Sequence, residues 1–403
     1  GGDLAARRAG VGDADGAARQ ILVEMGQTVL PGYVGTTLLL SISVGLGVVL
    51  VGLSSAVAVT LFEFRGRRFF EWALLLPLAM PAYVVAYAYT DFLQFSGPFQ
   101  TWIREVTGWP GRVFPEVRNL GGAAWVFVFS LYPYVYVLSR TALATASGVR
   151  PKWRLLGAPM RRRLLAIALP LARPAVAAGT ALALMETLAD FGVSSYFGIQ
   201  TFTAGIYKAW LAMDNRLAAA QLATILLGLV GLLLFLERQS QQKMRCAQER
   251  GARSGSMDAR VHVLTGGQQM VAWLLCGVPV LAGFVLPVLF MLRPLVADWG
   301  TLSWEPFLGW AWNSVRLGLI SAVLAVALAL WLAFQLRRDP EVTTRWAVQM
   351  VGLGYAVPGA VIVVGLLLPL GWLQGVAPQM GLGYLITATA LGLVWAYLVR
   401  FCA

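Results

Sequence analysis

Long apolar runs alternate with short charged segments along the whole chain. Nine of these runs have about 20 residues, the length that an α-helix needs to cross a hydrocarbon core roughly 30 Å thick. The pattern therefore predicts an all-α, polytopic membrane protein with about nine spanning helices. The predicted spans cover residues 33–61, 72–93, 121–139, 172–192, 217–236, 270–292, 313–335, 346–371 and 382–399.

Composition supports a membrane protein with the lipid bilayer as a partner. The 403 residues are 58% hydrophobic and 12% charged, and their mean hydropathy is +0.70. The net charge is +12, but the basic residues form short clusters between apolar runs, so we predict no nucleic-acid partner. The chain has one histidine, and its three cysteines are not spaced as in a disulfide framework or a zinc site. We therefore expect no metal site, no disulfide and no cofactor.

The basic clusters also predict how the chain is oriented. Residues 140–173 contain eight lysines and arginines and no acidic residue, which indicates a cytoplasmic segment. Counting spans outward from it places the other basic clusters on the same side. The loops at 94–120 and 190–216 carry charges of both signs and are predicted to lie outside.

Two matched sequence pairs indicate an internal duplication. "GYVGTTLLL" from Gly32 resembles "GWAWNSVRL" from Gly309, and the same offset of 277 residues brings Pro81 onto Pro358. Repeated membrane halves are typical of transporters. We therefore expect an N-terminal segment (1–31) on the outer side, a first membrane half (32–236) with a cytoplasmic loop at 140–171, a cytoplasmic linker (237–269) and a second half (270–403) that ends before a matching loop.

Four residues inside predicted spans are candidates for a translocation path. Glu186 and Asp190 lie four residues apart, hence on one face of a helix, and ionisable residues within spans are costly unless they serve a function. Either they line the path and attract a cation, or they cap and connect helices. Pro81 and Pro358 fall in the middle of predicted spans. Each could kink its helix as part of a gate, or simply as a structural bend.

The chain is not expected to be an enzyme. None of its three lysines, Lys152, Lys208 and Lys243, ends a P-loop motif, and it lacks a set of nucleophile, histidine and acid suited to hydrolysis. Energy for transport must then come from a partner or from an ion gradient.

One segment of the cytoplasmic loop resembles a known family. In "LLGAPMRRRLLAIALP", nine residues separate Gly157 from the sequence Ile-Ala-Leu-Pro, a spacing similar to that of permease subunits of binding-protein-dependent ABC importers. Where that family has an acidic residue and two alanines, this chain has "PKW", so we expect the second half, after Arg400, to supply the main coupling loop. The resemblance implies that an ABC ATPase dimer in the cytoplasm contacts Arg154, Gly157, Ile167, Leu169 and Pro170.

Longer stretches resemble the ferric-iron permeases of these importers. They include "EWALLLPLAMPAYVVAYAYTDFLQFSGP" and "METLADFGVSSYFGIQTFTAGIY". The resemblance implies a type I ABC importer permease fold, the bacterial inner membrane, a periplasmic substrate-binding protein and ferric iron as cargo. The alternatives are a thiamine, phosphonate or polyamine permease of the same class, or an ion-coupled secondary transporter that uses Glu186 and Asp190.

Overall fold

The computed structural model describes residues 19–146, 169–251, 262–301, 303–338, 341–352, 354–376 and 390–402. Most of these residues are helical, and the strands among them are two of two residues each, which confirms the all-α expectation. The chain forms two compact units. Unit 1 comprises Gly1–Tyr33, Phe202–Val230 and Asp298–Ala403, and unit 2 comprises Val34–Thr201 and Gly231–Ala297.

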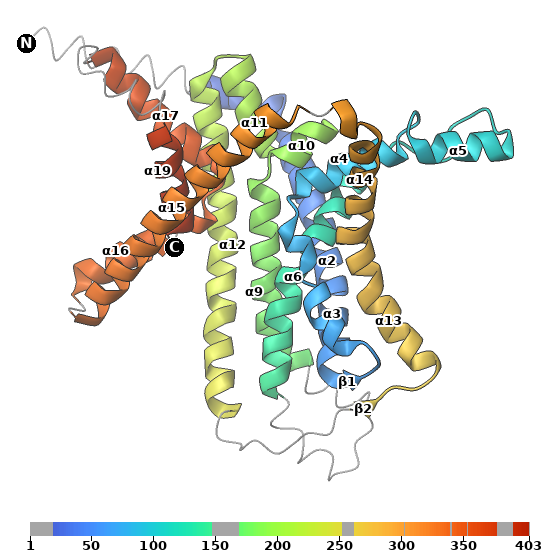
Figure 1. Ribbon diagram of the computed structural model, residues 1–403. Helices are drawn as coiled ribbons and strands as arrows, with labels where there is room; N and C mark the ends of the chain where they lie inside the picture. The colour runs from blue at the N-terminus through green and yellow to red at the C-terminus, as the bar shows by residue number, and fades with distance from the viewer. Residues whose placement is uncertain are drawn as a thin grey trace, which may run out of the picture. The chain divides into compact units, whose positions relative to one another are not determined.

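Unit 2 is built from long helices and a broken helix, and α2 and α12 each run from one unit into the other. Figure 1 shows β1 and β2 at one end of its long helices, and α5 and α10 at the opposite end. Its elements are α2 (Leu30–Leu61), β1 (Phe62–Glu63), α3 (Arg67–Ala73), η1 (Leu76–Ala79), α4 (Ala82–Leu93), α5 (Pro98–Thr107), α6 (Leu120–Ala146), α9 (Leu169–Ala189), α10 (Gly192–Phe197), α12 (Arg216–Gly251), β2 (His262–Val263), α13 (Gly267–Val280), η5 (Leu281–Val285) and α14 (Leu286–Ala297).

Small residues allow the helices of unit 2 to pack closely. A Cβ atom added at Gly179 of α9 would lie 2.7 Å from the Cα of Val135 in α6, and one at Gly52 of α2 would lie 2.8 Å from the carbonyl oxygen of Tyr132. Tyr132 and Tyr136 are fully buried beside these contacts. Gly179 and Gly52 therefore allow close helix packing.

The span expected at 72–93 is not one continuous helix. It consists of part of α3, the 3-10 helix η1 and α4, and the segments Arg67–Ala79 and Ala82–Thr107 meet at 89°. Pro77 lies in η1 and Pro81 is the N-cap residue of α4. Since proline has no backbone N–H to donate, two prolines four residues apart end one helix and begin the next. The bend expected at Pro81 is therefore a break between two helices rather than a kink within one.

Unit 1 contains a second broken helix. The carbonyl of Pro358 accepts hydrogen bonds from the N–H groups of Val361 (2.9 Å) and Ile362 (3.1 Å), so this proline also precedes a helix rather than lying inside one. The elements of unit 1 are a helix at 19–27, α11 (Phe202–Tyr207), the π-helix η4 (Lys208–Ala212), the first part of α12, η6 (Trp299–Thr301), α15 (Trp304–Arg338), α16 (Val342–Gly352), η7 (Gly354–Ala356), α17 (Gly359–Val376) and α19 (Ala390–Phe401).

Among the described residues, five helical segments are long and apolar enough to cross a membrane, and the bent pair makes a sixth if it is one span. The five are Leu30–Leu61, Leu120–Ala144, Arg216–Leu236, Gly267–Ala297 and Trp304–Arg338. The span expected at 172–192 corresponds to α9, that at 346–371 is divided by η7, and that at 382–399 lies partly outside the described residues. The expectation of a multi-pass membrane protein is confirmed.

The segment α13–α14 packs within unit 2, although the sequence assigned it to the second half. The hydroxyl of Ser55 in α2 donates to the carbonyl of Leu275 (3.0 Å), and the phenol of Tyr89 in α4 donates to the carbonyl of Ala282 (2.7 Å). These hydrogen bonds give buried polar groups partners in an apolar environment, which makes them costly to break.

Candidate functional site

The predicted coupling loop follows α6 and precedes α9. Its residues Arg154, Gly157 and Ile167 lie outside the described residues. Leu169 and Pro170 are the first two residues of α9, where a proline is tolerated because the first turn of a helix has no partner for its N–H groups. Of the predicted coupling residues, the structure thus describes only these two, at the start of α9.

A cluster of ion pairs lies at the α6 side of this loop. Arg140, near the end of α6, approaches the carboxylate of Glu71 in α3 at 2.9 Å. Arg67 approaches the same carboxylate at 3.3 Å and that of Glu63 at 2.6 Å. The phenol of Tyr136 also donates to the backbone carbonyl of Glu71 (3.2 Å). The helix that leads into the predicted loop is therefore attached to α3 by charge and by a hydrogen bond.

The surroundings of this cluster decide how strong the pairs are. The side chains of Glu71 and Arg140 are 20% and 37% exposed. Partial shielding from water strengthens the attraction relative to a fully exposed pair, and the remaining exposure avoids the full cost of burying a charge.

The turn between α2 and α3 is held to the start of α13. Residues Phe62 and Glu63 pair in parallel with 262 and 263, and the N–H of Leu264 donates to the carbonyl of Glu63 (2.9 Å). The indole N–H of Trp273 donates to the carbonyl of Arg65 (2.9 Å). This end of unit 2 therefore connects α2, α3, α6 and α13 in one polar assembly.

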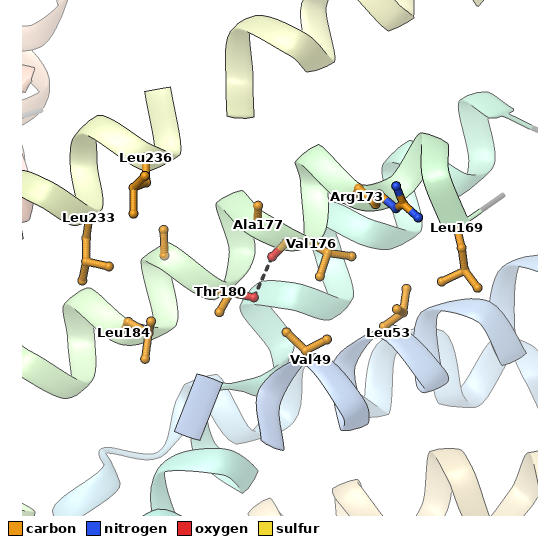
Figure 2. A pocket seen from close by; sticks show the side chains of 11 residues that line it. Val49, Leu53, Leu169, Arg173, Val176, Ala177, Thr180, Leu184, Leu233 and Leu236 are labelled. Carbon is orange, nitrogen blue, oxygen red and sulfur yellow. Dashed lines mark hydrogen bonds between the residues drawn. The ribbon is translucent and has the colours of Figure 1, made fainter. Parts of the chain in front are cut away.

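An apolar cavity of about 590 Å³ opens between α2, α9 and α12 (Figure 2). Leu169 and Arg173 lie at one end of it and Leu233 and Leu236 at the other. Thr180 donates its hydroxyl proton to the carbonyl of Val176 (2.7 Å) and is therefore not available to a ligand as a donor. The lining is apolar apart from Thr180 and Arg173, and the guanidinium of Arg173 is itself a cation, so the cavity offers nothing that attracts a hydrated cation. The full lining is Val49, Leu53, Leu169, Arg173, Val176, Ala177, Thr180, Ala181, Leu184, Leu233 and Leu236.

The carboxylates of Glu186 and Asp190 lie at the other end of α9. Both residues are half-buried. One oxygen of Asp190 accepts hydrogen bonds from the backbone N–H groups of Val193 (2.8 Å) and Ser194 (3.4 Å) at the start of α10. A carboxylate in this position satisfies N–H groups that have no partner within the helix. Asp190 therefore fixes the connection between α9 and α10.

The sequence interpretation overlooked Glu71, and it used Arg67 and Arg140 to orient the chain and to mark the start of the cytoplasmic loop, not as site residues. A signal was present, because Glu63, Arg67 and Glu71 follow one another at intervals of four residues with alternating charge. In the part of the chain that the structure describes, no three His, Cys, Asp or Glu side chains gather in a way that could hold a metal ion.

No protein-family model matches the chain. It is similar to the Fe(3+)-transport system permease protein FbpB 2 of Haemophilus influenzae, with 25% identity over 335 residues. The match covers 82% of this chain and 62% of that protein, so the chain spans less than two thirds of its relative's length. The resemblance to ferric-iron permeases is thereby confirmed. The chain is a polytopic, all-α membrane protein that resembles the permease of an iron transport system.

Proposed function

We propose that this chain is the permease subunit of an ATP-driven, binding-protein-dependent importer of ferric iron in a bacterial inner membrane. The similarity to a Fe(3+)-transport permease over 335 residues carries the proposal. Because the chain has no P-loop, ATP hydrolysis falls to a cytoplasmic ATPase dimer. A periplasmic binding protein delivers the cargo, and the permease itself catalyses no reaction.

The positions of the helix ends support two homologous halves. The helices α2 and α15 end at residues 61 and 338, and α4 and α17 begin at residues 82 and 359. Both pairs differ by 277 residues, the offset of the sequence repeat. A 3-10 helix and a proline precede the second helix of each pair. Two equivalent halves suit a mechanism of alternating access, in which they rock about a central path.

The ion-pair cluster provides a route from the ATPase into the membrane part of the first half. A movement of the predicted coupling loop displaces the end of α6 and the start of α9. Because Arg140 in α6 is paired with Glu71 at 2.9 Å, α3 moves with α6. The broken segment α3–η1–α4 then receives the displacement at its cytoplasmic side.

Glu186 is the residue that we assign to the path. Carboxylates are suitable ligands for a hard cation such as ferric iron, and Glu186 lies one turn before the end of α9, half-buried. Asp190 supports it by fixing α10 through the backbone N–H groups of Val193 and Ser194.

Co-purification tests the coupling loop. The change Gly157→Asp is expected to abolish retention of the ATPase, because it puts a side chain and a charge where the family resemblance predicts a glycine turn. The matched control is Gly300→Asp, at a position where an added Cβ meets nothing within 4 Å. Equal retention of the ATPase by both variants would contradict the assigned loop.

Uptake of radiolabelled ferric iron into proteoliposomes tests the cargo and the energy source. Uptake is expected to require the ATPase, ATP and the binding protein, and Glu186→Gln is expected to lower it about tenfold. Glu116→Gln, whose carboxylate is 63% exposed, is the control. Uptake that needs no ATPase and stops when the proton gradient is removed would identify a secondary transporter. Uptake of thiamine, a phosphonate or a polyamine in place of iron would identify another cargo.

A further inference from the structure

Helix α5 turns its apolar side outward. Phe99, Trp102, Ile103 and Val106 recur at intervals of three and four residues and form one face of this helix. Trp102 is 58% exposed and Val106 is 66% exposed. Trp109, just beyond the helix, is 60% exposed. A helix of this composition on a water-facing surface would instead turn that face toward the protein.

The opposite face of α5 fixes this orientation. Gln100 is buried; its amide group donates to the carbonyl of Leu93 (2.8 Å) and accepts from the N–H of Val113 (3.2 Å). The guanidinium of Arg104 donates to the carbonyl of Phe95 (2.8 Å) and lies over its ring at 4.2 Å. Rotating α5 to hide Trp102 would break these contacts and leave the buried amide of Gln100 without partners, which is unfavourable.

The exposed face of α5 continues the apolar surface of a predicted span. Leu289 and Leu292 on α14 are 54% and 44% exposed, within one of the segments that can cross a membrane. Between them, Phe290 stacks on Phe92 at 3.9 Å, and Phe92 stacks on Phe99 at 5.9 Å. A row of aromatic rings thus joins α14, whose other side exposes Leu289 and Leu292, to the first turn of α5.

We propose that α5 and Trp109 form an anchor that lies in the plane of the membrane, at the boundary between lipid headgroups and acyl chains. Tryptophan is enriched at this boundary, and amphipathic helices with one aromatic, apolar face bind there. Figure 1 shows α5 at the end of unit 2 opposite β1 and β2, so the leaflet is the one opposite the ion-pair cluster. The anchor fixes the end of α4, the arm that follows the 89° bend.

Site-specific labelling in lipid nanodiscs tests the proposal without reference to the cargo. The three native cysteines, Cys246, Cys276 and Cys402, are first replaced. Val106→Cys and Thr107→Cys are then made in separate variants, and each new cysteine is labelled with an environment-sensitive fluorophore. Val106 lies at the centre of the apolar face, whereas Thr107 lies at its border: it is exposed and, one residue further on, points about 100° away from Val106. Trp102→Cys is a second position on the apolar face, in case the first variant does not fold.

We expect lipids with a nitroxide near the headgroup to quench the label at residue 106 and aqueous iodide to quench the label at residue 107. Iodide quenching at residue 106 is expected to be at least about threefold weaker than at residue 107. Equal quenching by iodide at the two positions would overturn the proposal. Shielding of residue 106 only after addition of a periplasmic binding protein would also overturn it, because the occupant would then be that protein.

Discussion

The broken helices α3–η1–α4 in unit 2 and α16–η7–α17 in unit 1 have the same order of parts: a short helix, a 3-10 turn, a proline and a second helix. Each turn packs against the helix that follows later in its own unit, η1 against α6 and η7 against α19. The contacts that hold the two breaks nevertheless differ in kind.

Charge holds the first break and close backbone packing holds the second. Glu71 of α3 pairs with Arg140 of α6, but the residue 277 positions later is Val348, which cannot form such a pair. Conversely, a Cβ atom at Gly354 in η7 would collide with the carbonyl oxygen of Val399 in α19, where the first break has Pro77. The first break therefore has an ion pair beside it, and the second has a backbone contact that leaves no room for a side chain.

The largest expected effect is at Gly354. Gly354→Val forces α19 away from η7, because the new side chain would occupy the space of the Val399 backbone, and this costs about 3 kcal/mol. Hydrogen exchange of the protein in nanodiscs should speed up in peptides from α16, α17 and α19 and stay unchanged in those from α3, α4 and α6.

Gly365→Val is the matched control for this change. It lies in the same broken segment, on α17, and an added Cβ there meets nothing within 4 Å, so we expect an effect within about 0.5 kcal/mol. If both valines accelerated exchange equally, close backbone packing would not be what holds the second break.

The next effect in size concerns the charges of the first break. Glu71→Gln leaves Arg140 and Arg67 without the carboxylate at 2.9 and 3.3 Å, and we expect a loss of about 1.5 kcal/mol in the stability of unit 2. A double-mutant cycle with Arg140→Gln should give a coupling energy of about 1 kcal/mol, which high salt reduces because the pair is partly exposed.

The exposed pair between Arg112 and Glu116 provides the comparison. Its atoms are 3.9 Å apart and its side chains are 61% and 63% exposed, so Glu116→Gln should change stability by less than about 0.5 kcal/mol. A coupling energy near zero for Glu71 and Arg140 would mean that the first break is held by packing alone.

The sequence predicted the helices of both breaks and a possible kink at Pro81 and Pro358, but not that each span divides into separate helices. Apolar length is the main signal for a span, and it does not change where a helix bends inside a bundle. At the first break, Pro77 beside Pro81 was an available signal. At the second, Pro358 was the available signal. Gly354 is needed because the backbone of α19 packs against it, and this contact cannot be seen in the local sequence.

As with the breaks, the part of the candidate site that lies within one stretch of chain could be predicted from the sequence, and the contacts between helices could not. The four-residue spacing of Glu63, Arg67 and Glu71 indicates pairs along one stretch of chain, whereas the partner Arg140 belongs to another helix. The exposed face of α5 was also hidden, because an amphipathic pattern does not say whether its apolar side packs against protein or faces lipid. These features depend on tertiary contacts, which a single sequence does not encode by pattern.

The smallest expected effect is one that the two breaks should share. At both, the proline carbonyl accepts the first hydrogen bonds of the following helix, from Val84 and Val85 at the first (3.0 and 3.3 Å) and from Val361 and Ile362 at the second (2.9 and 3.1 Å). Alanine keeps this carbonyl, and the φ angle of −59° at Pro81 suits it. Pro81→Ala and Pro358→Ala should therefore each cost only about 0.5 kcal/mol, through greater freedom of the unfolded chain.

Thermal unfolding and hydrogen exchange of these two variants measure how far the breaks are equivalent. Equal, small losses would mean that the bends are fixed by the surrounding contacts, by Glu71 with Arg140 in one unit and by Gly354 with Val399 in the other. A loss several times larger at one proline would show that this break depends on the proline ring. In that half the proline would then determine the bend, and the two breaks would be stabilised by different interactions.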